Sequence, residues 1–180
     1  LKLLASAYAV ETRQIFVGRG SDEAIDLLVR AFCRAGRDAV LVSPPTFGMY
    51  AVAAGVQGAS VVSVPLRAEN DFALDSVSLL QAAESHPVKL VFVCTPNNPT
   101  GGSVPVENIR GLAQALAGRA LVVVDEAYAE FADSPSLVAD LADFPNLVVL
   151  RTLSKAYGLA GARLGVLIAS AEIVGLIRRI

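Results

Sequence analysis

The chain alternates between short apolar runs, typical of buried strands, and longer segments with helical periodicity. Four of the runs are nearly continuous: residues 39–42, 89–94, 120–124 and 146–150. Strands of this kind belong to sheets that are covered on both faces. Between them lie segments such as 21–33, in which apolar residues recur at helical spacing. The alternation predicts an α/β fold with three layers, α/β/α, around a mostly parallel sheet.

The remaining pattern completes this expectation. Further strands are predicted at residues 15–17, 60–64 and 164–168, and further helices at residues 1–10, 47–54, 74–84, 106–116 and 172–180. Ser21 suits the N-cap of its helix, and Asp22 suits the first turn. With no internal repeat or linker, the 180 residues are expected to form one domain.

Composition excludes several classes of protein. Charged residues make up 18% of the chain, below the roughly 25% of an ordinary domain, which fits a doubly covered sheet or a missing contact surface. A net charge of −2 without a basic cluster provides no footprint for nucleic acid. No apolar run is long enough for a membrane span, and no signal peptide is recognisable. We therefore expect a cytoplasmic protein that binds neither nucleic acid nor membrane.

No catalytic or metal-binding role is expected for the cysteines or the histidine. Cys33 and Cys94 each lie in an apolar context, so we expect reduced, buried thiols. His86 stands in a polar link before Pro87. A zinc site needs more ligands than this, and no metal is expected.

Polar residues gather where predicted strands end. Ser43, Thr95, Asp125 and Thr152 each follow or close an apolar run. Ligands of open α/β sheets bind beyond the carboxyl ends of the strands. The pattern therefore predicts a ligand site at that edge of the sheet.

The most reactive candidate is Lys155, which follows the strand at 146–150 and precedes a loop of small residues. A lysine held at a strand end is well placed to act as a nucleophile. Ser154 and Arg163 flank it and suit an anion. The combination indicates a lysine that forms a Schiff base with a phosphorylated aldehyde.

Two further features support a charged aromatic ligand. Residues 18–23, Gly-Arg-Gly-Ser-Asp-Glu, lead into a helix whose first N–H groups suit a phosphate. The run is no Walker A loop, and Glu23 replaces the third glycine of a dinucleotide fingerprint. Asp125, at the end of an apolar strand, is costly to bury unpaired and suits a cationic ring nitrogen. Tyr128 lies three residues after Asp125 and is expected on the same side, and Asn98 offers amide hydrogen bonds from a rigid turn.

In this order and spacing, the motifs resemble those of fold-type I pyridoxal-phosphate aminotransferases. They are Asn98-Pro99-Thr100-Gly101, Asp125-Glu126-Ala127-Tyr128 and Ser154-Lys155 with Arg163. The local sequence resembles that of the histidinol-phosphate aminotransferase subgroup at residues 20–25, 44–50, 125–131 and 151–157. The resemblance covers nearly the whole chain, but only the large, cofactor-binding domain of that family. The N-terminal arm and the C-terminal small domain have no counterpart, so the chain is expected to be a piece without turnover of its own.

The resemblance implies a role for each matching residue toward pyridoxal 5'-phosphate. Lys155 would form the Schiff base and move the proton, and Asp125 would pair with the pyridine nitrogen. Asn98 and Tyr128 would hydrogen-bond the ring hydroxyl oxygen. The other matching residues serve the phosphate and the ring face: Ser21, Asp22, Ser154, Arg163 and, more weakly, Thr152 for the phosphate, and Phe47 for stacking on the ring.

The implied reaction exchanges an amino group between L-histidinol phosphate and 2-oxoglutarate, in an intact protein expected to be a homodimer. One alternative is another fold-type I enzyme, such as a threonine-phosphate decarboxylase or an aromatic aminotransferase. A second is a non-catalytic aminotransferase-like module that binds the cofactor or a partner. A nicotinamide dehydrogenase is disfavoured by Glu23.

Overall fold

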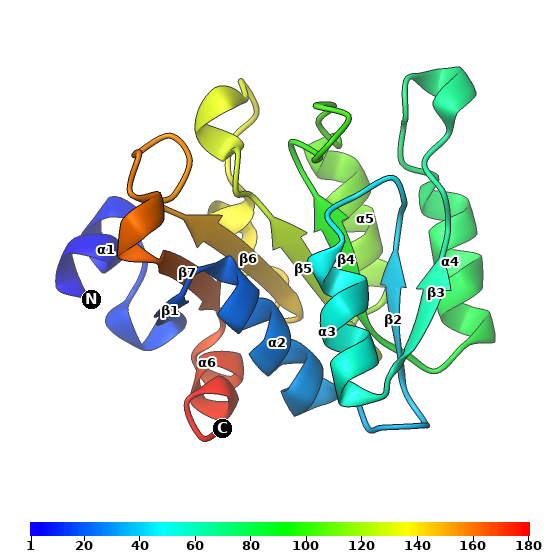
Figure 1. Ribbon diagram of the computed structural model, residues 1–180, viewed down its shortest axis with the longest axis horizontal. Coiled ribbons are helices and arrows are strands. Elements are labelled where there is room, and N and C mark those ends of the chain that lie inside the picture. The colour runs from blue at the N-terminus through cyan, green and yellow to red at the C-terminus, as the bar shows by residue number, and fades with distance from the viewer.

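The computed structural model describes residues 1–180 and contains one seven-stranded sheet in the order β1-β7-β6-β5-β4-β2-β3 (Figure 1). Only β7 runs antiparallel to its neighbours, so the prediction of a mostly parallel sheet is confirmed. The strands are β1 (Ile15–Arg19), β2 (Ala39–Val42), β3 (Ser60–Ser63), β4 (Val88–Cys94), β5 (Leu121–Asp125), β6 (Leu147–Thr152) and β7 (Leu164–Ala169).

Helices cover both faces of the sheet, which confirms the three-layer prediction. The α-helices are α1 (Lys2–Ala7), α2 (Ser21–Phe32), α3 (Met49–Gln57), α4 (Ser76–Ser85), α5 (Val106–Ala115) and α6 (Ala171–Ile177). In Figure 1, α2, α3 and α6 lie on one face, while α4 and α5 lie on the other. None of these helices combines the length and apolar character needed to cross a membrane.

The core is split into two clusters by the alternation of side chains along the strands. In β5, Val122 and Val124 pack into one cluster, while Val123 packs into the other. All three side chains are fully buried. Burying a valine side chain stabilises a fold by about 1.5–3 kcal/mol. The continuous apolar runs therefore supply both layers of the core at once, and only their ends are left for chemistry.

The first turn of α2 differs in detail from the prediction. Ser21 is the first helical residue, and Gly20 is the N-cap, with φ of 86°. A side chain at Gly165 of β7 would place its Cβ only 2.1 Å from the carbonyl carbon of Gly20. Because neither glycine carries a side chain, the strand passes close under the start of α2. The expected N-cap at Ser21 is wrong, but its backbone is brought to the edge of the sheet.

Other helix boundaries shift by one to three residues. The helix predicted from Phe47 begins at Met49, so Phe47 remains in the preceding loop. The last helix ends at Ile177 instead of continuing to Ile180. The first shift has a consequence for function, because it leaves the Phe47 ring free to line a cavity rather than a helix surface.

Candidate cofactor site

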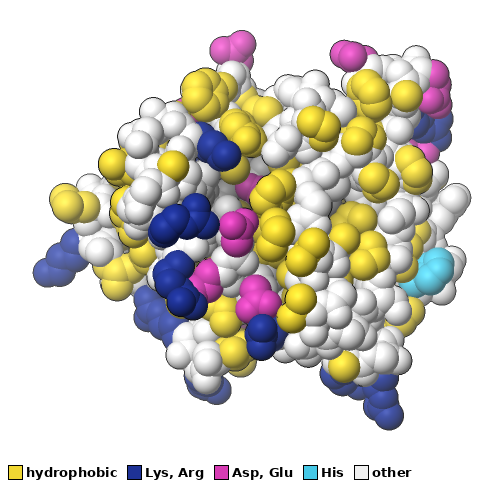
Figure 2. Space-filling view, in the orientation of Figure 1, with side chains coloured by type: hydrophobic (Ala, Val, Ile, Leu, Met, Phe, Trp, Pro, Cys, Tyr) yellow, Lys and Arg dark blue, Asp and Glu magenta, His cyan; other side chains and the backbone are white.

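A cavity of about 120 Å³ opens at the carboxyl ends of β5 and β6, beside the first turn of α2. Figure 2 shows acidic and basic side chains gathered beside the start of α2, whereas the surface over α3 is mostly apolar or uncharged. The cavity is lined by Gly20, Ser21, Asp22, Phe47, Cys94, Asn98, Asp125, Ala127, Tyr128, Thr152, Ser154, Lys155 and Arg163. All ten residues to which the resemblance gives a role belong to this set, so the structure brings them together in one cavity.

Asp125 lies at the floor of the cavity and is only 2% exposed. Its Oδ2 accepts a hydrogen bond from the Tyr50 hydroxyl at 2.7 Å, and its Oδ1 accepts one from the Ala127 N–H at 3.1 Å. Burial raises the pKa of the Asp125 carboxyl. No lysine or arginine of the chain forms an ion pair with it. The site therefore offers a buried carboxylate to a cation that a ligand supplies.

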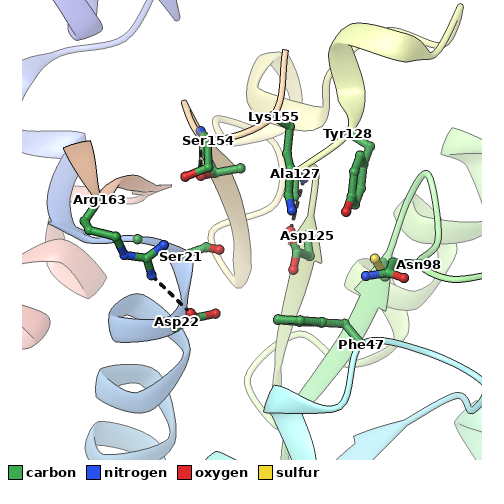
Figure 3. A pocket seen from close by; sticks show the side chains of 13 residues that line it. Ser21, Asp22, Phe47, Asn98, Asp125, Ala127, Tyr128, Ser154, Lys155 and Arg163 are labelled. Atoms are coloured by element: carbon green, nitrogen blue, oxygen red, sulfur yellow. Dashed lines mark hydrogen bonds and ion pairs between the residues drawn. The ribbon is translucent and has the colours of Figure 1, made fainter. Parts of the chain in front are cut away.

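Lys155 enters the same cavity from the loop that follows β6, and its side chain is directed toward Asp125 (Figure 3). Its Nζ lies 5.2 Å from the centroid of the Tyr128 ring. The chain provides no hydrogen bond or ion pair for this amine. An amine left free in a polar cavity is suited to nucleophilic attack on a carbonyl group.

One end of the cavity is built for an anion. The N–H groups in the first turn of α2 have no acceptor within the helix. Arg163 reaches the same end, where its Nη2 donates to Asp22 Oδ2 at 3.4 Å. A Cβ on Gly20 would lie 2.7 Å from that Nη2, so the missing side chain makes room for the guanidinium. Ser154 adds a hydroxyl, and Thr152 Oγ1 accepts from the Ser154 N–H at 3.2 Å.

The remaining walls are aromatic and amide groups. Phe47 lies across the cavity from Lys155, and Asn98 closes the end opposite Arg163 (Figure 3). The neighbouring Asn97 is buried and serves the loop: it accepts from Thr46 Oγ1 at 2.8 Å and donates to the Pro45 carbonyl at 3.0 Å. This anchoring holds the loop so that Asn98, not Asn97, faces the site.

Sequence reasoning assigned no role to Tyr50, although it lies in a motif quoted for the resemblance. Cys94 was expected to be buried and reduced, which is confirmed, but it also lines the cavity. Two of the strand-end residues do not reach it. Thr95 Oγ1 accepts from the Val104 N–H at 2.9 Å, and Ser43 is buried beside a separate cavity.

These features fit one class of ligand. A buried carboxylate without a cationic partner suits a protonated ring nitrogen, and an aromatic wall suits a planar ring. The helix start and Arg163 suit a phosphate, and the free amine of Lys155 suits an aldehyde. Pyridoxal 5'-phosphate carries all four groups, so the fold and the donor set define a site of the pyridoxal-phosphate-dependent class.

Comparison with known proteins agrees with this class. Residues 2–180 match the family model described as aminotransferase class I and II, and the chain belongs to that family. The family depends on pyridoxal 5'-phosphate.

Curated relatives of the chain carry the name of one enzyme of this family. The chain is 53% identical over 179 residues to the histidinol-phosphate aminotransferase of Xylella fastidiosa, covering 99% of this chain and 49% of that protein. It is 55% identical over 177 residues to the enzyme of the same name from Xanthomonas campestris, covering 98% of this chain and 49% of the other. The chain thus spans about half the length of these curated relatives.

A solved structure shows the same fold. The histidinol-phosphate aminotransferase from Sinorhizobium meliloti in complex with pyridoxal-5'-phosphate matches with a TM-score of 0.91 at 33% identity. The match covers 99% of this chain and 48% of that one. The likeness therefore extends over the whole sheet and both helical layers.

Proposed function

We propose that the protein containing this chain is an aminotransferase that exchanges an amino group between L-histidinol phosphate and 2-oxoglutarate. The observation that carries the proposal is the pairing, in one cavity, of a buried carboxylate that lacks a cation with a free lysine amine. The identities of 53% and 55% to enzymes named histidinol-phosphate aminotransferase support the choice of substrate.

Each residue would bind a different part of the cofactor. Asp125 would bind the protonated ring nitrogen, Phe47 would stack on the ring, and Asn98 and Tyr128 would donate to its hydroxyl oxygen. The phosphate would be bound by Arg163 and by a polar set at that end of the cavity: Ser154, Thr152 and the N–H groups of Ser21 and Asp22. The bound cofactor supplies an electron sink for the carbon that loses a proton.

Lys155 has two tasks in this scheme. Its Nζ would hold the cofactor covalently through the aldehyde carbon, and once displaced by the substrate amine it would carry the proton to and from the substrate carbon. A base must lie within hydrogen-bond reach of the proton that it moves. The position of Lys155, on the loop beside Tyr128 and directed toward Asp125, supports this role.

We further propose that residues 1–180 form the cofactor-binding large domain, that the intact protein is a cytoplasmic homodimer, and that this domain alone binds cofactor without steady turnover. An apolar groove of about 740 Å³ beside the lysine loop supports association. It is lined by residues such as Leu3 and Tyr157, which are 88% and 55% exposed. Sedimentation of the intact protein tests the homodimer.

A chimera tests the function: these 180 residues replace the matching half of the Xylella fastidiosa relative. With cofactor bound, L-histidinol phosphate should convert the visible absorbance to that of the amino form, and 2-oxoglutarate should restore it. Lys155→Ala in the same chimera is the control and should do neither. If the chimera binds cofactor but releases carbon dioxide from L-threonine phosphate instead, the decarboxylase alternative is correct.

A further inference from the structure

A buried aromatic residue, Tyr50, connects two walls of the cofactor cavity. Its side chain is fully buried, and its ring stacks on Phe92 with centroids 4.6 Å apart and an interplanar angle of 7°. The Phe47 ring meets the Tyr50 ring edge-on, at 5.6 Å and 81°. Phe47 lines the cavity, so its ring is supported from behind by the Tyr50–Phe92 stack.

The Tyr50 hydroxyl contacts the opposite side of the site. It donates to Asp125 Oδ2 at 2.7 Å, which joins α3 to the end of β5 across 75 positions of sequence. The other carboxylate oxygen accepts only from the Ala127 N–H, two residues away on the same segment. Tyr50 is therefore the one side chain from another element that fixes the rotation of the Asp125 carboxylate.

We propose that Tyr50 is a positioning residue, whose hydroxyl orients Asp125 toward the ring nitrogen of the cofactor while its ring supports Phe47. This inference rests on the proposed function, because it concerns the same cavity. Tyr50 touches neither the cavity nor the reacting atoms, and it acts through two residues that do.

The electrostatics of the pair agree with this role. Burial raises the pKa of the Tyr50 hydroxyl well above its ordinary value, so the hydroxyl remains a donor. Its hydrogen bond opposes the effect of burial on the pKa of Asp125 and so favours the carboxylate. A carboxylate held in one orientation needs no rearrangement when a cationic ring nitrogen arrives.

The test uses the 180-residue chain, with pyridoxamine 5'-phosphate and its 1-deaza analogue as probes. The analogue has carbon in place of the ring nitrogen, so it offers nothing to Asp125. Tyr50→Phe retains the ring and removes only the hydroxyl. The dissociation constant for pyridoxamine 5'-phosphate should rise roughly tenfold, as for the loss of a hydrogen bond to a charged group. The constant for the 1-deaza analogue should stay unchanged.

Two controls separate positioning from packing. Phe92→Leu weakens the support of the Tyr50 ring but leaves its hydroxyl, and should weaken both probes by similar factors. In an Asp125→Asn background, Tyr50→Phe should cause no further loss of pyridoxamine 5'-phosphate affinity, because the two residues act as one unit. Thermal unfolding without probe shows whether each variant retains its fold.

Equal weakening of both probes by Tyr50→Phe, or no weakening of either, overturns the positioning role. If Tyr50→Phe unfolds, the Asp125→Asn variant decides: equal affinity of that variant and the wild-type chain for pyridoxamine 5'-phosphate overturns the role as well. If the wild-type chain itself binds no pyridoxamine 5'-phosphate, the proposal that this domain alone binds cofactor fails, and the inference with it.

Discussion

Two adjacent acids at the end of β5 are buried equally and treated differently. Asp125 and Glu126 are 2% and 3% exposed. Glu126 forms an ion pair with Arg151 at 2.8 Å, and it accepts from the Ser136 hydroxyl at 2.6 Å and the Leu137 N–H at 2.8 Å. Asp125 accepts from two neutral donors and has no cation. The chain itself supplies a cation for Glu126, whereas Asp125 lacks one and can receive it from a ligand.

The difference shows how stability and function are divided between neighbours. An ionised carboxylate is costly to bury unless a cation and hydrogen bonds compensate it. Arg151 meets this demand for Glu126, and it also pairs with Glu130 at 2.5 Å and lies 5.5 Å from the centroid of the Tyr8 ring. Asp125, which lines the cavity, has no such compensation, so we expect it to contribute to ligand binding while lowering stability.

The largest effect on stability is expected from removing the ion pair between Arg151 and Glu126. Arg151→Met should lower the free energy of unfolding by about 3–5 kcal/mol, because it leaves the buried Glu126 carboxylate unpaired. Urea unfolding of the chain measures this. The matched control is Arg30→Met, since the exposed Arg30–Asp26 pair should contribute less than about 1 kcal/mol. Similar losses in the two variants would contradict the contrast between buried and exposed pairs.

A substitution of Asp125 should affect ligand binding and leave stability intact. Asp125→Asn should leave the free energy of unfolding of the cofactor-free chain unchanged or raise it, because an unpaired buried charge is removed. The same change should weaken pyridoxamine 5'-phosphate binding by about 2–5 kcal/mol, the usual loss when one partner of a buried charge pair is removed. Calorimetric titration together with urea unfolding checks both. A variant that unfolds easily yet binds normally would reverse the assignment.

The stability contribution of Asp125 should depend on pH. The pKa of the Asp125 carboxyl is raised in the folded state, so the folded chain binds this proton more tightly than the unfolded chain. Its contribution to stability is largest at low pH and declines as pH rises above the unfolded value of about 3.9. Asp125→Asn should therefore gain stability relative to the wild-type chain as pH rises through this window. A gap that stays constant with pH would show that Asp125 is ionised as easily in the folded chain as in the unfolded one.

The smallest effect concerns the pair at the anion end of the cavity. Asp22 and Arg163 have side chains 43% and 54% exposed and lie 3.4 Å apart. Asp22→Asn should change the free energy of unfolding by less than about 0.5 kcal/mol, because exposed pairs are screened by water and salt. Thermal unfolding at two salt concentrations provides the measurement, and a loss comparable to that in Arg151→Met would mean that this pair is structural.

The fold was largely predictable because the inner strands of the sheet are both apolar and short. Runs such as residues 121–124 can be buried only between two layers, and the glycine-rich approach to Ser21 marks a helix start. The direction of β7 was not predictable: it pairs antiparallel with both β1 and β6, which depends on contacts between residues far apart in the chain. The N-cap at Gly20 was not predicted for the same reason, because the contact between Gly20 and Gly165 joins residues far apart in the chain.

The site was predictable where motifs carry the chemistry. Each of the ten residues chosen from the sequence lines one cavity. Tyr50 was missed because nothing local distinguishes a tyrosine in a helix from an ordinary core residue, and its role becomes visible only when α3 is packed against β5. Ser43 and Thr95 were expected near the ligand because they follow strands, yet β2 and β4 direct them elsewhere.

We propose that Asp125 and Lys155 together define a covalent pyridoxal-phosphate site. The most direct measurement incubates the chain with pyridoxal 5'-phosphate, reduces it with borohydride and locates the modified residue by peptide mass spectrometry. We expect one visible absorbance band that reduction abolishes, and a phosphopyridoxyl group confined to Lys155. A label on the exposed Lys2 or the half-buried Lys89, or a band that persists in Lys155→Ala, would contradict this assignment.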